Sequence, residues 1–292
     1  CEKLLEREYG DKIHGLAEQI RDLESSEKVD GREEMSLYLA EEFATGALSE
    51  DFDNNAERVE AAIRTCVAIL TEGVVAAPIE GIGKVKIEPN DDGETEFIRI
   101  PYFGPIRSAG GTAQAVSVLV ADYVRDLLDI AVFQPREEEV ERYVEEIHLY
   151  DSQVGMQYCP PKDKARYIIK HTPIMVDGQP NLQAVGREVD GYRDLERIDG
   201  NAPRDGMCLV MAEGIGLKAP KLKRYSEAFG LDSWSWMDKL IQGEGDDEDE
   251  EETENESGEE ENEDEEDTYD VPLRTDEATI LDQKKKFNRR DR

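Results

Sequence analysis

A glycine-rich segment lies directly before the most apolar stretch of the sequence. Residues 103–112 read FGPIRSAGGT. Backbone N–H groups at a helix start attract anions, glycine lets a phosphate approach closely, and an arginine adds a charged fork. The phosphate contacts that this pattern predicts are Arg107, Ser108, Gly110, Gly111 and Thr112. In the structural alternative the paired glycines form a tight turn and Thr112 caps the helix. The residue types alone favour this alternative.

A second candidate segment is a basic run in a chain whose formal net charge is −35. Residues 216–224 read GLKAPKLKR, and the basic residues are Lys218, Lys221, Lys223 and Arg224. Such a local reversal of charge is suited to contact with a nucleic-acid backbone. A basic helix that pairs with neighbouring carboxylates explains the run equally well. Trp234 and Trp236 could stack on bases, but packing of an amphipathic helix is the simpler explanation.

The sequence provides no recognisable catalytic or metal-binding set. It contains no GxxxxGK[ST] motif, and Gly214-Ile215-Gly216 lacks the third glycine of a dinucleotide fingerprint. Asp51-Phe52-Asp53 has the spacing of a carboxylate pair but not the continuation of a calcium loop. No partner at ligand spacing accompanies the histidines His14, His148 and His171. We therefore predict no catalytic residue, bound metal or cofactor in this chain.

Composition and charge restrict the class of protein. Hydrophobic residues make up 38% of the chain, so most of it can bury a core, whereas residues 244–270 contain 19 acidic side chains and no basic one. The acidic excess and scarce lysine are typical of a salt-adapted cytoplasm. Four scattered cysteines favour a reducing compartment. No apolar run is long enough for a membrane span. Because the first residue is Cys1, we expect a fragment or a processed product.

The pattern of apolar residues predicts an α+β fold. Three amphipathic stripes within residues 1–72 predict a helical bundle. Within residues 73–150, alternation on either side of Asp91-Asp92-Gly93 predicts a hairpin, followed by helices at 113–128 and 136–150.

The remainder predicts a second αβ region and two polar segments. Residues 151–241 contain strand-like pieces at 173–176 and 207–212, turns at Asp177-Gly178 and Asp205-Gly206, and helices at 221–229 and 233–241. Residues 242–270 are expected to form a disordered acidic linker, and residues 271–292 a basic tail.

Several of these segments together resemble a known family. They read FGPIRSAGGTAQA at 103–115, EEEVERYVEEI at 137–147, GYRDLER at 191–197, GMCLVMAEGI at 206–215 with LKAPK at 217–221, and TEGVVAAPIEG at 71–81. In this order they resemble the amino-terminal part of the large subunit of archaeal DNA polymerase D, also called DNA polymerase II. The resemblance covers about residues 10 to 241. The acidic linker and the final basic block depart from the pattern and resemble insertions of salt-loving relatives.

The resemblance implies a DNA-directed DNA polymerase whose large subunit works on a primer-template with a small subunit that carries a metal-dependent 3′–5′ exonuclease. The family's polymerase carboxylates lie in double-psi barrels further along the large subunit. This chain corresponds to about the first quarter of that subunit, so no catalytic residue transfers to it and the fragment alone is expected to be inactive. Mg²⁺ is expected for the complete polymerase.

Two roles for this segment remain open on the sequence. In the first, it contributes DNA contact and assembly through the two phosphate-binding candidates. In the second, it is a non-enzymatic module that self-associates or docks the small subunit. Salt-dependent binding of primer-template DNA distinguishes the two roles.

Overall fold

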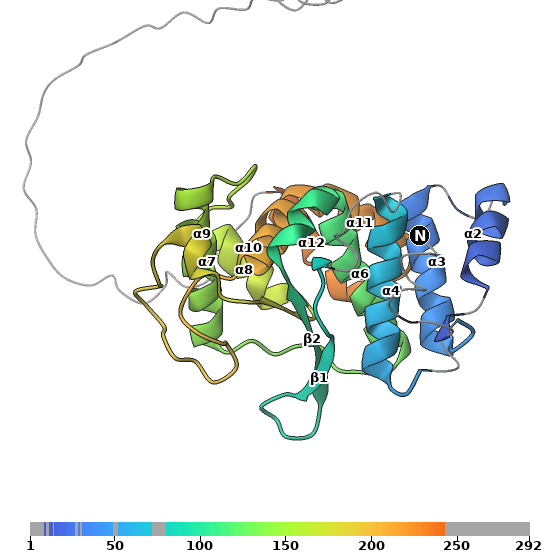
Figure 1. The fold of residues 1–292 in the computed structure, drawn as a ribbon, viewed down its shortest axis with the longest axis horizontal. Coiled ribbons are helices and arrows are strands. Elements are labelled where there is room, and N and C mark those ends of the chain that lie inside the picture. Colours follow the sequence, from blue (N-terminus) through green and yellow to red (C-terminus); the bar gives the residue numbers. More distant parts are fainter. Residues whose placement is uncertain are drawn as a thin grey trace, which may run out of the picture. The chain divides into compact units, whose positions relative to one another are not determined.

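The computed structural model describes residues 9, 12–13, 15–26, 29, 31–48, 52–71 and 80–242. Within them, helices accompany a small sheet of three strands, whose hairpin of β1 (Lys86–Pro89) and β2 (Glu96–Tyr102) projects past the helices in Figure 1, and this confirms the α+β class. Apart from Gln242, the expected acidic linker and basic tail lie outside the described residues.

The amino-terminal stripes fold as predicted into helices α2 (Leu16–Ser25), α3 (Arg32–Thr45) and α4 (Asn55–Leu70). Asn54 caps α4, because its side-chain oxygen accepts a hydrogen bond of 3.0 Å from the backbone N–H of Glu57. Cys66 is fully buried on α4, and burial raises the pKa of its thiol to about 12. The thiol therefore behaves as a small hydrophobic group.

The predicted hairpin is also confirmed. Strands β1 (Lys86–Pro89) and β2 (Glu96–Tyr102) pair antiparallel. Asp92 holds the turn, because its carboxylate accepts hydrogen bonds from the backbone N–H groups of Glu94 and Thr95 at 2.9 and 2.8 Å. Strand β3 (Met175–Gly178) pairs parallel with the other edge of β2, so β2 is the central strand.

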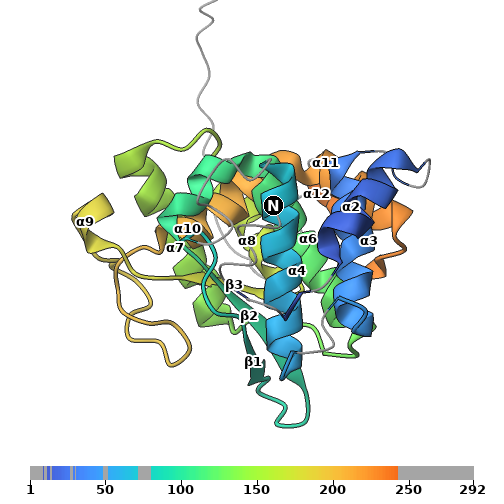
Figure 2. The ribbon, with the colours of Figure 1, turned by 45° about the vertical axis from the view of Figure 1, so that its right-hand side comes forward.

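Helix α6 (Gly110–Leu127) is the hub of the packing. It contacts α3 and α4, which lie beside it in Figure 2, and it also contacts α11 (Leu217–Ala228) and the π-helix η3 (Val210–Gly216). Most of its side chains are buried as a result. Three further helices follow α6 in the chain, namely α7 (Glu137–Val154), α8 (Lys162–His171) and α9 (Leu182–Val185). Helix α7 contacts both α8 and α9, and α8 contacts η3.

The strand-like stretch at 207–212 is helical, so that prediction is wrong. Residues Asp205–Leu209 form α10, and η3 continues it into α11. The stretch is buried on every side, and an apolar run with no exposed face has no period that separates strand from helix. The two Asp-Gly turns are wrong for a related reason, since Asp177 and Gly178 end β3 and Asp205 begins α10.

The last described elements are the 3₁₀-helix η4 (Asp232–Trp234) and helix α12 (Met237–Gln242). One hydrophobic core extends from Leu16 to Leu240, and the described residues belong to one compact unit by their contacts. The division of this unit into domains at residues 72 and 150 stays a prediction.

Candidate nucleic-acid interface

The glycine-rich segment folds as a short 3₁₀-helix, η2 (Gly104–Ala109), that turns directly into α6. Gly110 makes the turn with φ of 78°, a value that side chains disfavour. Helix α6 begins at this residue, and its capping position is Ala109, which supplies no side-chain hydrogen bond. Thr112 is therefore inside the helix, and its expected role as the cap is wrong.

Arg107 is presented on the surface of this junction. Its guanidinium lies 6.0 Å from the centre of the Tyr150 ring of α7 and forms no ion pair within the described part of the chain. Burial raises the pKa of Tyr150 to about 12, although the nearby positive charge of Arg107 opposes this rise. Ser108 and Gly110 are exposed beside Arg107. Arg107 thus places a positive charge, without an ion-pair partner among the described residues, next to the start of a long helix.

The structure brings the two predicted segments together at Gly111. A methyl group placed on Gly111 would lie 2.4 Å from the backbone carbonyl oxygen of Glu213 and 3.0 Å from Cε of Lys218. Only glycine allows α6 to pack this closely on η3. Lys218, in the first turn of α11, therefore lies against the start of α6, and it forms no ion pair with the carboxylates that the structure describes. We call Arg107, Gly110, Gly111, Thr112 and Lys218 the junction patch.

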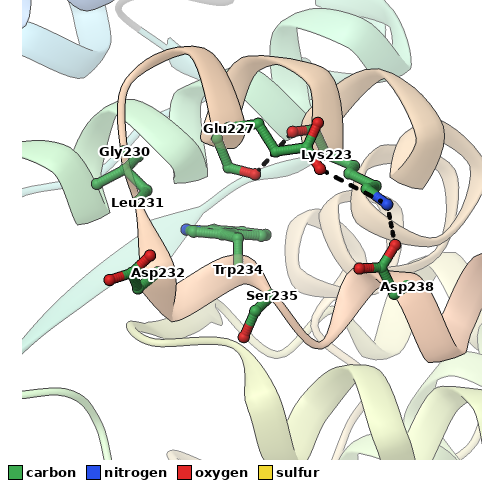
Figure 3. Close-up of a pocket in the computed structure, with 9 residues that line it drawn as sticks. Lys223, Glu227, Gly230, Leu231, Asp232, Trp234, Ser235 and Asp238 are labelled. Atoms are coloured by element: carbon green, nitrogen blue, oxygen red, sulfur yellow. Dashed lines mark hydrogen bonds and ion pairs between the residues drawn. The ribbon is translucent and has the colours of Figure 1, made fainter.

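The other predicted basic residues already have partners. Lys221 Nζ lies 2.5 Å from an oxygen of Glu33 in α3. Figure 3 shows Lys223 between Asp238 and Glu227, at the rim of a hollow beside Trp234; its Nζ lies 3.6 Å from Glu227. Arg224 donates a hydrogen bond of 2.8 Å to the Tyr225 hydroxyl and lies over the same ring. These contacts favour the structural alternative for three of the four basic residues of the run.

The two tryptophans pack inside the protein. Trp234 is 1% exposed, and its indole N–H donates a hydrogen bond of 2.8 Å to Asp122 of α6. Trp236 is also buried, and its ring stacks on that of Trp234 with centroids 5.7 Å apart. This agrees with the packing explanation of the sequence pattern.

A second group of charges lies in the core, and the sequence did not reveal it. Arg204 Nε lies 2.9 Å from a Glu146 oxygen, and Arg204 Nη1 lies 2.6 Å from Asp177. Arg142 approaches the other Glu146 oxygen at 2.7 Å, and Arg99 approaches Asp177 at 2.6 Å. Burial alone would raise the pKa of Asp177, but Arg204 and Arg99 outweigh it, so that pKa is lowered. We call these five residues the buried charge cluster.

Among the described residues, no group of three or more His, Cys, Asp or Glu side chains could hold a metal ion, and no helix could span a membrane. Of the acidic pair, Asp53 lies 3.3 Å from Lys12, whereas Asp51 is outside the described residues, as is His14. The rings of His148 and His171 each contact a backbone carbonyl oxygen one turn earlier in their own helices.

The sequence of the chain identifies its family. Residues 2–243 match the model of the amino-terminal region of the DNA polymerase II large subunit, and the chain belongs to this family. It is 56% identical over 232 residues to the DNA polymerase II large subunit of Haloarcula marismortui and 54% identical over 232 residues to that of Halobacterium salinarum. Each match covers 79% of this chain and 16% of the relative.

A methanogen relative shows the same partial coverage. The DNA polymerase II large subunit of Methanosarcina barkeri is 53% identical over 231 residues, which cover 79% of this chain and 20% of the relative. Among the relatives compared, the share matched ranges from 10% to 20%. The matched part of the chain therefore spans between a tenth and a fifth of the length of these relatives.

Proposed function

We propose that this chain is the amino-terminal part of the large subunit of an archaeal replicative DNA polymerase, in which it contributes DNA contact and assembly rather than catalysis. The complete polymerase would extend a primer on a DNA template with Mg²⁺, in the cytoplasm, alongside a small subunit with 3′–5′ exonuclease activity. The family membership supports the activity of the whole protein. None of the described residues forms a site for Mg²⁺, so no catalytic step is assigned to them.

One observation carries the proposed DNA contact, which is the approach of Lys218 to Gly111. Two segments more than 100 residues apart in the sequence thereby place Arg107 and Lys218 at one helix start. Neither side chain forms an ion pair within the described residues. In a chain with a net charge of −35, this is a place where a phosphate backbone would meet positive charge.

The junction patch would bind phosphate at short range. The backbone N–H group of Gly110 donates to the carbonyl oxygen of Arg107, so the N–H groups that follow it in the first turn of α6 would contact the phosphate, and Gly110 has no side chain to block the approach. Arg107 would add a planar donor pair and Lys218 a point charge. Such contacts position a nucleic acid and do not read its sequence. Ser108, whose hydroxyl donates to the carbonyl oxygen of Pro105 at 2.8 Å, would line the edge of this contact.

Lys221, Lys223 and Arg224 would contribute less to DNA binding than Lys218. Each would have to leave a partner that it contacts in the structure before it could bind a phosphate. We therefore assign them mainly to the packing of α11 against α3 and α12. Lys221 and Lys223 therefore provide a matched control, because these two charges on α11 can be removed without changing the junction patch.

The proposal is tested by DNA binding of two charge-matched double variants of this chain. The first is Arg107→Ala with Lys218→Ala, and the second is Lys221→Ala with Lys223→Ala. Binding of two unrelated primer-templates is measured by fluorescence anisotropy over a salt series. We expect the first variant to weaken both complexes equally and to lower the slope of log affinity against log salt by about 2, roughly one per lost phosphate contact.

The second variant should leave the slope nearly unchanged. Circular dichroism and thermal melting would confirm that both variants remain folded. An unchanged affinity and slope in the Arg107 and Lys218 variant would show that the junction patch does not contact DNA. The chain would then be better explained as a module for self-association or for docking the small subunit.

A further inference from the structure

A groove runs along α7, between the start of α8 and the loop that follows α9. Its volume is about 520 Å³, which is within the range of small-ligand sites and larger than the hollow of about 270 Å³ beside Trp234. Val144 and Leu149 form its floor, Lys162 of α8 lines one wall, and Arg187 and Tyr192 line the other. No residue of this groove was among the sites predicted from the sequence.

Tyr192 is exposed although its backbone is held firmly. The side chain is 49% exposed, one of the most exposed large apolar side chains in the described structure. Its carbonyl oxygen accepts a hydrogen bond of 2.8 Å from the buried guanidinium of Arg142. The backbone N–H groups of Asp190 and Gly191 donate to Glu145 at 2.6 and 2.9 Å. An aromatic ring on such an anchored backbone loses little conformational entropy when a ligand stacks on it.

The groove also contains two cations that no carboxylate contacts directly within the described residues. Within the described residues, neither Lys162 nor Arg187 forms an ion pair. The third basic residue, Arg166, is paired with Glu141, with Nη2 3.0 Å from Oε2. The Glu145 carboxylate is occupied by the loop N–H groups, so Asp190 is the acidic side chain of the groove without such a partner. The three basic and three acidic side chains of the groove thus balance in formal charge, in a chain whose net charge is −35.

An exposed aromatic ring beside two unpaired cations is the combination that binds single-stranded nucleic acid. We infer that this groove binds a short stretch of single-stranded DNA, with a base stacked on Tyr192 and phosphates contacted by Lys162 and Arg187. A base stacked on an exposed ring must have an open face, which bases within a duplex lack. The groove therefore goes beyond the junction patch, because it would bind a single strand and not a paired primer-template.

The test uses the 292-residue chain and a fluorescently labelled oligo(dT) as the probe. Tyr192→Ala should weaken binding by about 5- to 140-fold, the effect of losing one stacked base, whereas Tyr192→Phe should retain it. Lys162→Ala with Arg187→Ala should lower the salt slope by about 1.4, since each phosphate contact on a single strand contributes about 0.7. Tyr38→Ala and Arg21→Ala with Lys239→Ala are the matched controls and should change neither quantity.

The result also separates this groove from the junction patch. Arg107→Ala with Lys218→Ala should reduce binding of duplex primer-template, and the groove variants should reduce binding of oligo(dT). Absence of oligo(dT) binding by the unaltered chain, or unchanged binding by both folded groove variants, would overturn the inference. Loss of association with the small subunit at unchanged oligo(dT) binding would overturn it as well and would identify the groove as a protein-docking site.

Discussion

The junction patch and the buried charge cluster use the same kinds of side chain in opposite ways. In the cluster, Arg204 and Arg142 are fully buried, and both are paired with the carboxylate of Glu146. In the patch, Arg107 is exposed and lies only over an aromatic ring. The comparison shows that a basic residue is available to a ligand only where the fold leaves it without a carboxylate, whatever the net charge of the chain.

The largest expected effect comes from breaking the buried charge cluster. Arg204→Met removes the partner shared by Glu146 and Asp177 and leaves each of these buried carboxylates with one arginine, Arg142 or Arg99. We expect the free energy of unfolding to fall by about 3–5 kcal/mol, measured by urea denaturation. The exposed control Arg21→Met should stay within about 0.5 kcal/mol of the unaltered chain. A loss below about 1 kcal/mol for Arg204→Met would mean that the cluster does not stabilise the fold.

The next effect tests why glycine occupies the start of α6. Gly111→Ala would place a methyl group 2.4 Å from the Glu213 carbonyl oxygen and push α6 away from η3. We expect a loss of about 1–3 kcal/mol in the free energy of unfolding, as for other overpacked sites.

Thr112→Ala is the matched control one residue further on. Because the described structure gives the Thr112 hydroxyl no capping hydrogen bond, the change should be within about 0.5 kcal/mol, whereas loss of a true cap costs about 1 kcal/mol. Equal losses for the two variants would contradict the close packing at Gly111.

The smallest effect concerns the ion pair between Lys221 and Glu33. This pair is partly buried, so its exposure to solvent is between that of the junction patch and that of the buried charge cluster. Burial works to raise the pKa of Glu33, but the hydrogen bond and charge of Lys221 contribute to a net lowering from the usual 4.5. A lowered pKa gives stability that is present above pH 4.5 and lost as the pH falls through the folded-state pKa.

Lys221→Met should therefore destabilise the chain by up to about 1 kcal/mol near neutral pH, because the lysine is partly exposed. The difference from the unaltered chain should shrink below pH 4.5. Urea denaturation at several pH values measures it, with Lys239→Met as a control whose difference stays flat. A difference that does not change with pH would show that Glu33 is not the group responsible.

The sequence predicted elements whose pattern is local. The stripes of α3 and α4 and the turn at Asp92 follow from residues a few positions apart, and all are present in the structure. The stretch at 207–212 was assigned wrongly because burial on all sides removes the periodicity that separates helix from strand.

The site could be predicted only in part, because its arrangement depends on contacts between segments that are far apart in the sequence. The sequence identified both segments of the junction patch, but not the approach of Lys218 to Gly111, which depends on η3 crossing α6. The sequence could not show that Lys221 has an acidic partner whereas Lys218 lies at the junction patch, because the partner of Lys221, Glu33, is 188 residues away in the chain. The buried charge cluster gave no sequence signal, since its arginines resemble surface residues until the fold encloses them.

The parallel pairing of β2 with β3 has a consequence for how the chain assembles during synthesis. Arg99 and Asp177 are 78 residues apart, and α6, α7 and α8 lie between them. Contacts this distant in the sequence form late, because loop closure must precede them. The hairpin of β1 and β2 can form as soon as it leaves the ribosome, but one edge of β2 stays unpaired until β3 has been translated. An unpaired edge is a template for intermolecular pairing. Chains truncated before residue 175 should therefore aggregate more readily than chains that include β3.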